Sequence, residues 1–152
     1  MKFDVFSSRR RHLLRFLMGG GAYLLIEIVW RMLYQHRATH PIIMLPAGTV
    51  LMLLCFLDEK KWNIFLSALM GMLTVTCFEL VIGLIAIHAF DTYLWDYGGI
   101  PGNFMRVVCP RWSLIWYGTC FGVVFGRRLF WRLLRRIARH KKPSEQSNNE
   151  EK

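Results

Sequence analysis

The sequence predicts an all-α, polytopic integral membrane protein with four transmembrane helices, both termini in the cytoplasm and a basic amphipathic C-terminal helix. Three observations support this fold class. Of the 152 residues 54% are hydrophobic, and the mean hydropathy of +0.29 is too apolar for an ordinary soluble domain. The apolar residues gather in four long segments. The 20 Lys and Arg, which give a formal net charge of +10, lie mostly on one predicted side of these segments.

The four apolar segments differ in length. A bilayer core of about 30 Å needs about 20 helical residues, and Leu13–Tyr34, Trp62–Phe90 and Trp112–Trp131 meet this length. The second segment, Ile42–Leu57, is shorter and contains Pro46. Four spans are therefore expected, and three spans with one re-entrant segment are the alternative.

The positions of the cations predict the orientation. With the amino terminus inside, 16 Lys and Arg lie on the cytoplasmic side and 4 lie outside, and the opposite topology inverts this ratio. The predicted organisation is a basic cytoplasmic N-terminus (1–12), a transmembrane domain (13–131), a basic amphipathic extension (132–142) and a disordered polar tail (143–152).

Six arginines with apolar residues at helical spacing mark the C-terminal region: Arg127, Arg128, Arg132, Arg135, Arg136 and Arg139. This pattern is typical of a helix that lies on an anionic inner leaflet. Anchoring of the topology alone, or docking of a partner together with Lys60 and Lys61, are the alternatives.

Two glutamates lie inside apolar segments, where a charge is costly and often functional. Glu27 and Glu79 both fall in the outer half of the predicted membrane. Glu27 has Arg31 four residues later, so a local ion pair is the simple interpretation. Glu79 has no such neighbour on its own helix, and its partner is expected from elsewhere in the chain.

The loop between the third and fourth segments supplies further candidates. Trp95, Asp96 and Tyr97 suit the outer membrane interface, and the Gly-Gly-x-Pro-Gly run that follows predicts turns. Arg106 and Arg111 are the expected counter-charges for Glu79 and Asp96, with Glu27 as an alternative partner. An interfacial loop held by structural hydrogen bonds is one hypothesis. The other is a ligand or ion site made by Glu27, Glu79, Trp95, Asp96, Tyr97, Asn103 and Arg106.

Catalytic, cofactor and metal motifs are missing from the sequence. There is no phosphate-binding loop, hydrolase elbow or zinc-protease motif, and the four cysteines lack ligand spacing. We therefore expect no enzyme activity, no cofactor and no metal. Membrane topology explains the cations without a nucleic-acid partner.

One stretch of the sequence resembles a known family. Trp95-Asp96-Tyr97, Pro101-x-Asn103, Cys109 and Ser113-x-x-Trp116, after one Glu in each of the first and third helices, resemble the putative type IV ABC-transporter (CmpB-like) membrane protein family. The resemblance runs from about Leu17 to Phe125, so the basic extension is expected to lie outside it.

The resemblance implies a permease-like transporter component of the bacterial inner membrane, working with a separate ATPase subunit. Where this chain has Met105-Arg106, the family pattern usually has Asn-Gly. The arginine is therefore expected to add charge beside Asp96.

Two other functions remain open. The first is a small proton- or cation-coupled exporter acting as a homodimer, in which Glu27, flanked by Tyr23 and Trp30, binds an organic cation. The second is a membrane scaffold or accessory protein that transports nothing. Because four helices enclose little volume, either transport hypothesis favours a homo-oligomer.

Overall fold

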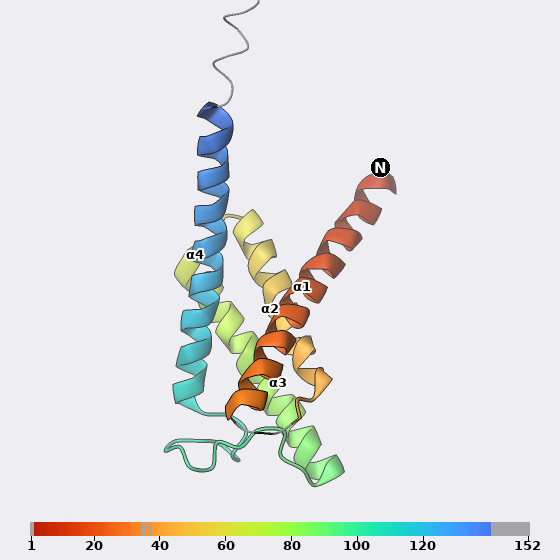
Figure 1. The fold of residues 1–152 in the computed structure, drawn as a ribbon, viewed down its shortest axis with the longest axis vertical. Coiled ribbons are helices and arrows are strands. Elements are labelled where there is room, and N and C mark those ends of the chain that lie inside the picture. Colours follow the sequence, from red (N-terminus) through yellow and green to blue (C-terminus); the bar gives the residue numbers. More distant parts are fainter. Residues whose placement is uncertain (1, 35, 37, 141–152) are drawn as a thin grey trace, which may run out of the picture.

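The protein is helical over most of its described length (Figure 1), which confirms the all-α class. The structure is a computed structural model and describes residues 2–34, 36 and 38–140. The predicted tail, 143–152, lies outside the described residues. The elements of the protein are α1 (Lys2–Tyr34), the 3-10 turn η1 (Pro41–Ile43), α2 (Met44–Glu59), α3 (Ile64–Phe90) and α4 (Pro110–His140).

Local chemistry accounts for the helix boundaries. The side chain of Asn63 caps α3 by accepting a hydrogen bond from the Phe65 amide at 2.8 Å. Asp91 ends α3 in the left-handed conformation, with φ of 47°. Pro46 lies in the first turn of α2, where a missing amide hydrogen costs nothing. The proline therefore does not interrupt α2, which runs on to Glu59.

Three helical stretches among the described residues are long and apolar enough to cross a membrane: Ser8–Tyr34, Pro41–Glu59 and Ile64–Phe90. They include the short second segment that the sequence left open. The fourth span, at Trp112–Trp131, stays a prediction. In the structure this segment belongs to α4, which continues without a break across the predicted domain boundary at residue 131.

Helices α2, α3 and α4 pack around a common core made of Val50, Leu54, Ala68, Val75, Cys120 and Val124. Helix α1 packs along α2 through glycines. A Cβ at Gly19 would lie 2.6 Å from the Cβ of Leu51, and one at Gly48 would lie 2.6 Å from the carbonyl oxygen of Phe16. Only glycine permits this approach of the two backbones.

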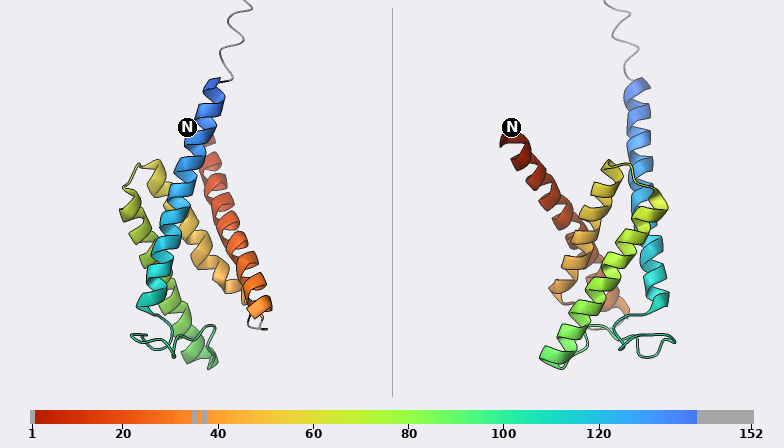
Figure 2. Two further views of the ribbon diagram at one scale, coloured as in Figure 1. Left: turned by 60° about the vertical axis from the view of Figure 1, so that its left-hand side comes forward. Right: turned by 180° about the vertical axis from the view of Figure 1, so that it is seen from behind.

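The molecule has two distinct ends (Figures 1 and 2). We call the end that carries η1 and the 91–109 loop the loop end. The opposite end, with the turn between α2 and α3 and the C-terminal half of α4, is the basic end. Helix α1 begins and α4 finishes toward the basic end. Both described chain ends therefore point the same way, while the assignment of that side to the cytoplasm stays a prediction.

Candidate functional site

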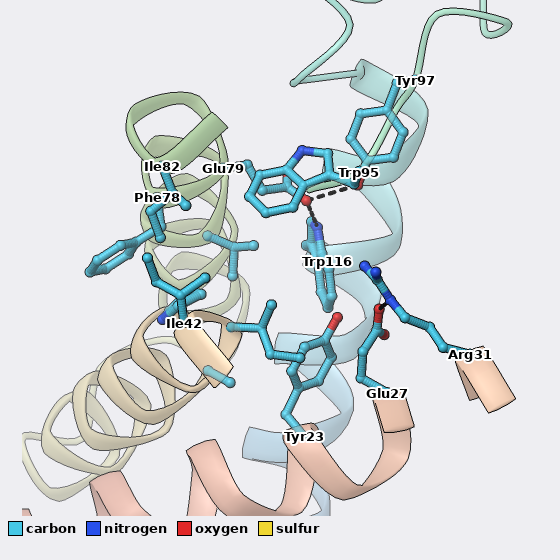
Figure 3. A pocket seen from close by; sticks show the side chains of 14 residues that line it. Tyr23, Glu27, Arg31, Ile42, Phe78, Glu79, Ile82, Trp95, Tyr97 and Trp116 are labelled. Atoms are coloured by element: carbon cyan, nitrogen blue, oxygen red, sulfur yellow. Dashed lines mark hydrogen bonds and ion pairs between the residues drawn. The ribbon is translucent and has the colours of Figure 1, made fainter. Parts of the chain in front are cut away.

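A cavity of about 100 Å³ lies at the loop end, among α1, α2, α3, α4 and the loop (Figure 3). Its polar and aromatic lining includes Tyr23, Glu27, Glu79, Trp95, Tyr97 and Trp116. A second, larger cavity of about 620 Å³ shares these residues except Glu79 and is lined in addition by Trp30, Asp96 and Trp112. The two spaces adjoin, so the smaller one is the inner part of a single recess.

Glu79 is the buried acid of this site, with 7% of its surface exposed. Its Oε1 accepts a hydrogen bond from the Tyr97 hydroxyl at 3.0 Å and another from the Trp116 indole at 3.0 Å (Figure 3). Its Oε2 is buried and has no hydrogen-bond partner among the described residues. The expectation of an arginine partner was wrong, because two neutral donors occupy the positions around Oε1 and Arg106 is bound elsewhere.

Glu27 is paired on its own helix. The Arg31 Nε donates to Glu27 Oε1 at 2.7 Å, which confirms the local ion pair. The same guanidinium also donates to the Leu94 carbonyl at 3.2 Å, so it ties α1 to the loop. The pair is neutral as a unit and leaves Glu79 as the uncompensated acid of the inner cavity.

The loop is fixed against α3 by close packing. Val107 is 1% exposed, and a Cβ at Gly83 of α3 would lie 2.7 Å from its Cβ. The indole of Trp95 donates to the Val107 carbonyl at 2.8 Å. Together these contacts hold Trp95 over the cavity.

Tyr97 is oriented by its backbone and its ring. Its amide donates to the Arg106 carbonyl at 2.8 Å, and its ring stacks on Trp112 with centroids 5.9 Å apart. Burial, with a further contribution from Glu79, raises the pKa of Tyr97. The phenol therefore stays protonated at neutral pH and donates a hydrogen bond to Glu79 Oε1.

Asp96 and Arg106 form an exposed ion pair on the loop. Arg106 Nε donates to Asp96 Oδ1 at 2.9 Å, and the Gly98 amide donates to the same oxygen at 2.8 Å. These hydrogen bonds lower the pKa of Asp96 to about 2, and the bond from Arg106 has the larger effect. The side chain of Asn103 donates to the Ile100 carbonyl at 2.8 Å and accepts from the Arg106 amide at 3.1 Å.

The structure thus divides the predicted site. It brings Glu27, Glu79, Trp95 and Tyr97 together around the inner cavity, and Asp96 lines only the outer one. Asn103 and Arg106 line neither space, and their side chains make hydrogen bonds within the loop.

Met105 and Arg106 form a tight turn at the position where the resemblance leads us to expect Asn-Gly. Their φ angles are 50° and 64°, between Phe104 and Val107, whose backbones are hydrogen-bonded at 3.1 Å. A turn with two positive φ values favours Asn-Gly, because a Cβ is strained in this conformation. This chain places an arginine there, and the expected charge beside Asp96 is confirmed.

Two residues of the site were not assigned a role in it from the sequence. Trp116 belongs to the motif that carries the resemblance, but its bond to Glu79, 37 positions earlier, depends on how α3 and α4 pack. From the sequence, Tyr23 was considered only in the exporter hypothesis, as a neighbour of Glu27. Its ring lies edge-on to Trp116, with centroids 5.7 Å apart, and lines both cavities. No metal site accompanies them, since within the described residues no three His, Cys, Asp or Glu gather to hold an ion.

At the basic end, acids and arginines form an ionic cluster of Asp58, Glu59, Arg15, Arg127 and Arg128. Asp58 accepts from Arg127 at 2.9 Å and from Arg128 at 2.6 Å, and Glu59 pairs with Arg15. Two of the arginines predicted to face lipid or a partner are therefore bound to the end of α2. Arg132, Arg135 and Arg136 are exposed, while the side chain of Arg139 lies outside the described residues.

A sequence model of the family described as "Putative ABC-transporter type IV" matches residues 15–143. The chain belongs to this family. The match extends beyond Phe125, so the expectation that the basic extension lies outside the resemblance was wrong. No curated protein and no solved structure matches the chain. The family and the apolar helices together identify this type IV ABC-transporter family member as a membrane protein associated with transport.

Proposed function

We propose that this protein is the permease-like component of an ATP-driven transporter and that the cavity at its loop end is a ligand site. The observation that carries the transport assignment is the family match over residues 15–143. The structure supports a ligand site because Glu79 is buried at the cavity with one oxygen unpartnered. Buried, uncompensated acids in membrane helices are typical of ion and substrate pathways.

We further propose four spans in a bacterial inner membrane, with both termini in the cytoplasm. Helix α4 packs along α3, and its other face exposes Leu114, Ile115, Val123 and Phe125. Such a face suits contact with lipid chains. The positive-inside rule places the basic end in the cytoplasm, and the exposed arginines beyond the bundle suit the anionic inner leaflet. Homo-oligomer formation stays a prediction.

A separate ATPase subunit follows from the same assignment. The sequence has no phosphate-binding loop. We therefore propose that the chain is not an enzyme and that a partner subunit hydrolyses the ATP that drives transport. Its docking surface would be the exposed cations of the basic end: Lys60, Lys61, Arg132, Arg135 and Arg136.

Gentle extraction of the full-length chain from native membranes tests this proposal. We expect an ATP-hydrolysing subunit to co-purify with it. Joint replacement of Arg132, Arg135 and Arg136 by glutamate should reduce the recovered ATPase activity. Arg106→Glu, which changes the charge at the opposite end, is the matched control and should leave recovery unchanged. Isolation of the wild-type chain without any ATPase would contradict the proposal.

An exporter that exchanges a cation for protons is the second candidate, and the uncompensated charge of Glu79 favours it. In this candidate we propose Glu79 as the coupling residue in place of Glu27, because Glu27 is paired with Arg31 while Glu79 has one unpartnered oxygen. In proteoliposomes without ATP, Glu79→Gln should then abolish proton movement driven by a cation gradient, whereas Glu59→Gln should not. A protein that moves no substrate with or without ATP would instead support the scaffold hypothesis.

A further inference from the structure

We propose that the inner cavity binds a small organic cation of the ammonium type, held by the carboxylate of Glu79 and the surrounding aromatic rings. This inference rests on the proposed function only in taking the cavity as a ligand site. It names the chemical class of the ligand, which the family match leaves open.

The charge balance of the recess calls for a cation. Four charged side chains line its two parts, and Glu27 is neutralised by Arg31 at 2.7 Å. Asp96 is paired with Arg106 on the loop. Glu79 has only two neutral donors, so an ionised Glu79 gives the recess one net negative charge. A carboxylate out of water without a counter-charge is costly, and a bound cation removes that cost.

The free oxygen of Glu79 is the position at which a cation would bind. Oε1 already accepts two hydrogen bonds, from Tyr97 and Trp116. A proton would therefore reside on Oε2, which accepts no hydrogen bond among the described residues. Oε2 has no protein donor among the described residues, and a bound ammonium ion supplies the missing counter-charge to the carboxylate.

The walls of the cavity are suited to an alkylated cation. Tyr23, Trp95, Tyr97 and Trp116 line it beside Glu79, and Ile42, Val75 and Ile82 complete its apolar side. Indole and phenol faces attract ammonium groups, and aromatic enclosures are the usual recognition site of methylated ammonium ions. A bare metal ion would find a single free carboxylate oxygen there and few other oxygen ligands.

The volume of the cavity sets the size of the ligand. About 100 Å³ has room for several water molecules or one small organic cation. The adjoining space of about 620 Å³ connects it to the loop end, and Trp30 and Trp112 line that outer part. Larger substituents on the ammonium group would therefore extend toward the loop end.

Equilibrium dialysis of labelled tetramethylammonium against the purified full-length chain tests the inference, with sodium at equal ionic strength as the competing ion. We expect saturable binding that sodium does not displace. Glu79→Gln keeps the shape and an acceptor for Tyr97 and Trp116 but removes the charge, and it should abolish binding. Glu59→Gln, the matched loss of a carboxylate at the basic end, should bind normally. Trp116→Phe should weaken binding roughly tenfold.

A pair of variants separates charge from folding. Glu27→Gln leaves Arg31 without its counter-charge in the recess and should weaken binding strongly. Replacing Glu27 and Arg31 together by glutamine restores the net charge and should restore binding. Thermal unfolding of each variant verifies that it is folded.

Two results would overturn the inference: no saturable uptake of tetramethylammonium by the folded wild type, or equal uptake by Glu79→Gln. Neither result depends on an ATPase. Cation binding by a chain that recruits no ATPase would leave the inference standing and remove the transporter proposal. A chain that recruits an ATPase but binds no cation would support the transporter proposal and overturn the inference.

Discussion

The two ends of the molecule treat their acidic side chains differently. At the basic end Asp58 is held by Arg127 and Arg128, and Glu59 is held by Arg15. At the loop end Glu79 is more deeply buried, yet its partners are a phenol and an indole. The acids of the ionic cluster therefore have a structural role that their own contacts explain. Glu79 lacks such an explanation, which is why we place the ligand there.

The largest expected effect is at the basic end. Asp58→Asn leaves two arginines, 23% and 27% exposed, without their shared counter-charge. We expect the free energy of unfolding to fall by about 3 kcal/mol, measured by denaturant titration in detergent micelles. Asp91→Asn is the control, because Asp91 is exposed and asparagine tolerates its left-handed backbone. Equal losses in the two variants would show that the ionic cluster does not hold the helices together.

Glu27→Gln tests the ion pair of the loop end and should cost less. Arg31 keeps its hydrogen bond to the Leu94 carbonyl, and glutamine still offers an oxygen. We expect a loss of about 2 kcal/mol in the free energy of unfolding in the same titration. Addition of Arg31→Gln should recover part of it, and a double variant less stable than both single ones would contradict this account.

Glu79→Gln should have a still smaller effect on stability. The amide oxygen can accept from Tyr97 and Trp116, and the cost of burying a charge disappears. We expect a change of less than about 1 kcal/mol in the free energy of unfolding, beside the complete loss of cation binding. A loss as large as that of Asp58→Asn would assign Glu79 the same structural role as the ionic cluster.

The smallest effect concerns Asp96, which is exposed. Its pKa is lowered to about 2, so the contribution of its ion pair to stability is fully present above pH 3.8 and is lost as the pH falls through about 2. The amide of Gly98, bound to the same carboxylate, reports this titration by NMR. We expect a midpoint near 2, moving toward 3.8 in Arg106→Gln. A midpoint near 3.8 in the wild type would mean that the ion pair does not form in solution.

The sequence predicted the interactions that are local in the chain. The pair of Glu27 and Arg31 follows from a spacing of four on a helix, and the charge that Arg106 adds beside Asp96 follows from their position in one loop. The burial of Glu79 in an apolar segment was equally visible.

The donors to Glu79 were not predictable in this way. Tyr97 is 18 and Trp116 is 37 positions away, and only the packing of α3, α4 and the loop brings them together. For the same reason Arg127 and Arg128 were grouped with the exposed arginines. Their partner, Asp58, is about 70 residues earlier, and charge patterning along one helix contains no information about it.

Helix α4 makes contacts at both ends of the molecule. Trp116, which donates to Glu79, and Arg128, which holds Asp58, are 12 residues apart on this uninterrupted helix, a rise of roughly 18 Å. A tilt of α4 that pulls Arg128 from Asp58 also displaces the indole from the cavity unless the helix bends. Because α4 is one continuous helix, a partner that displaces its exposed arginines would also displace Trp116 in the wall of the proposed cation site.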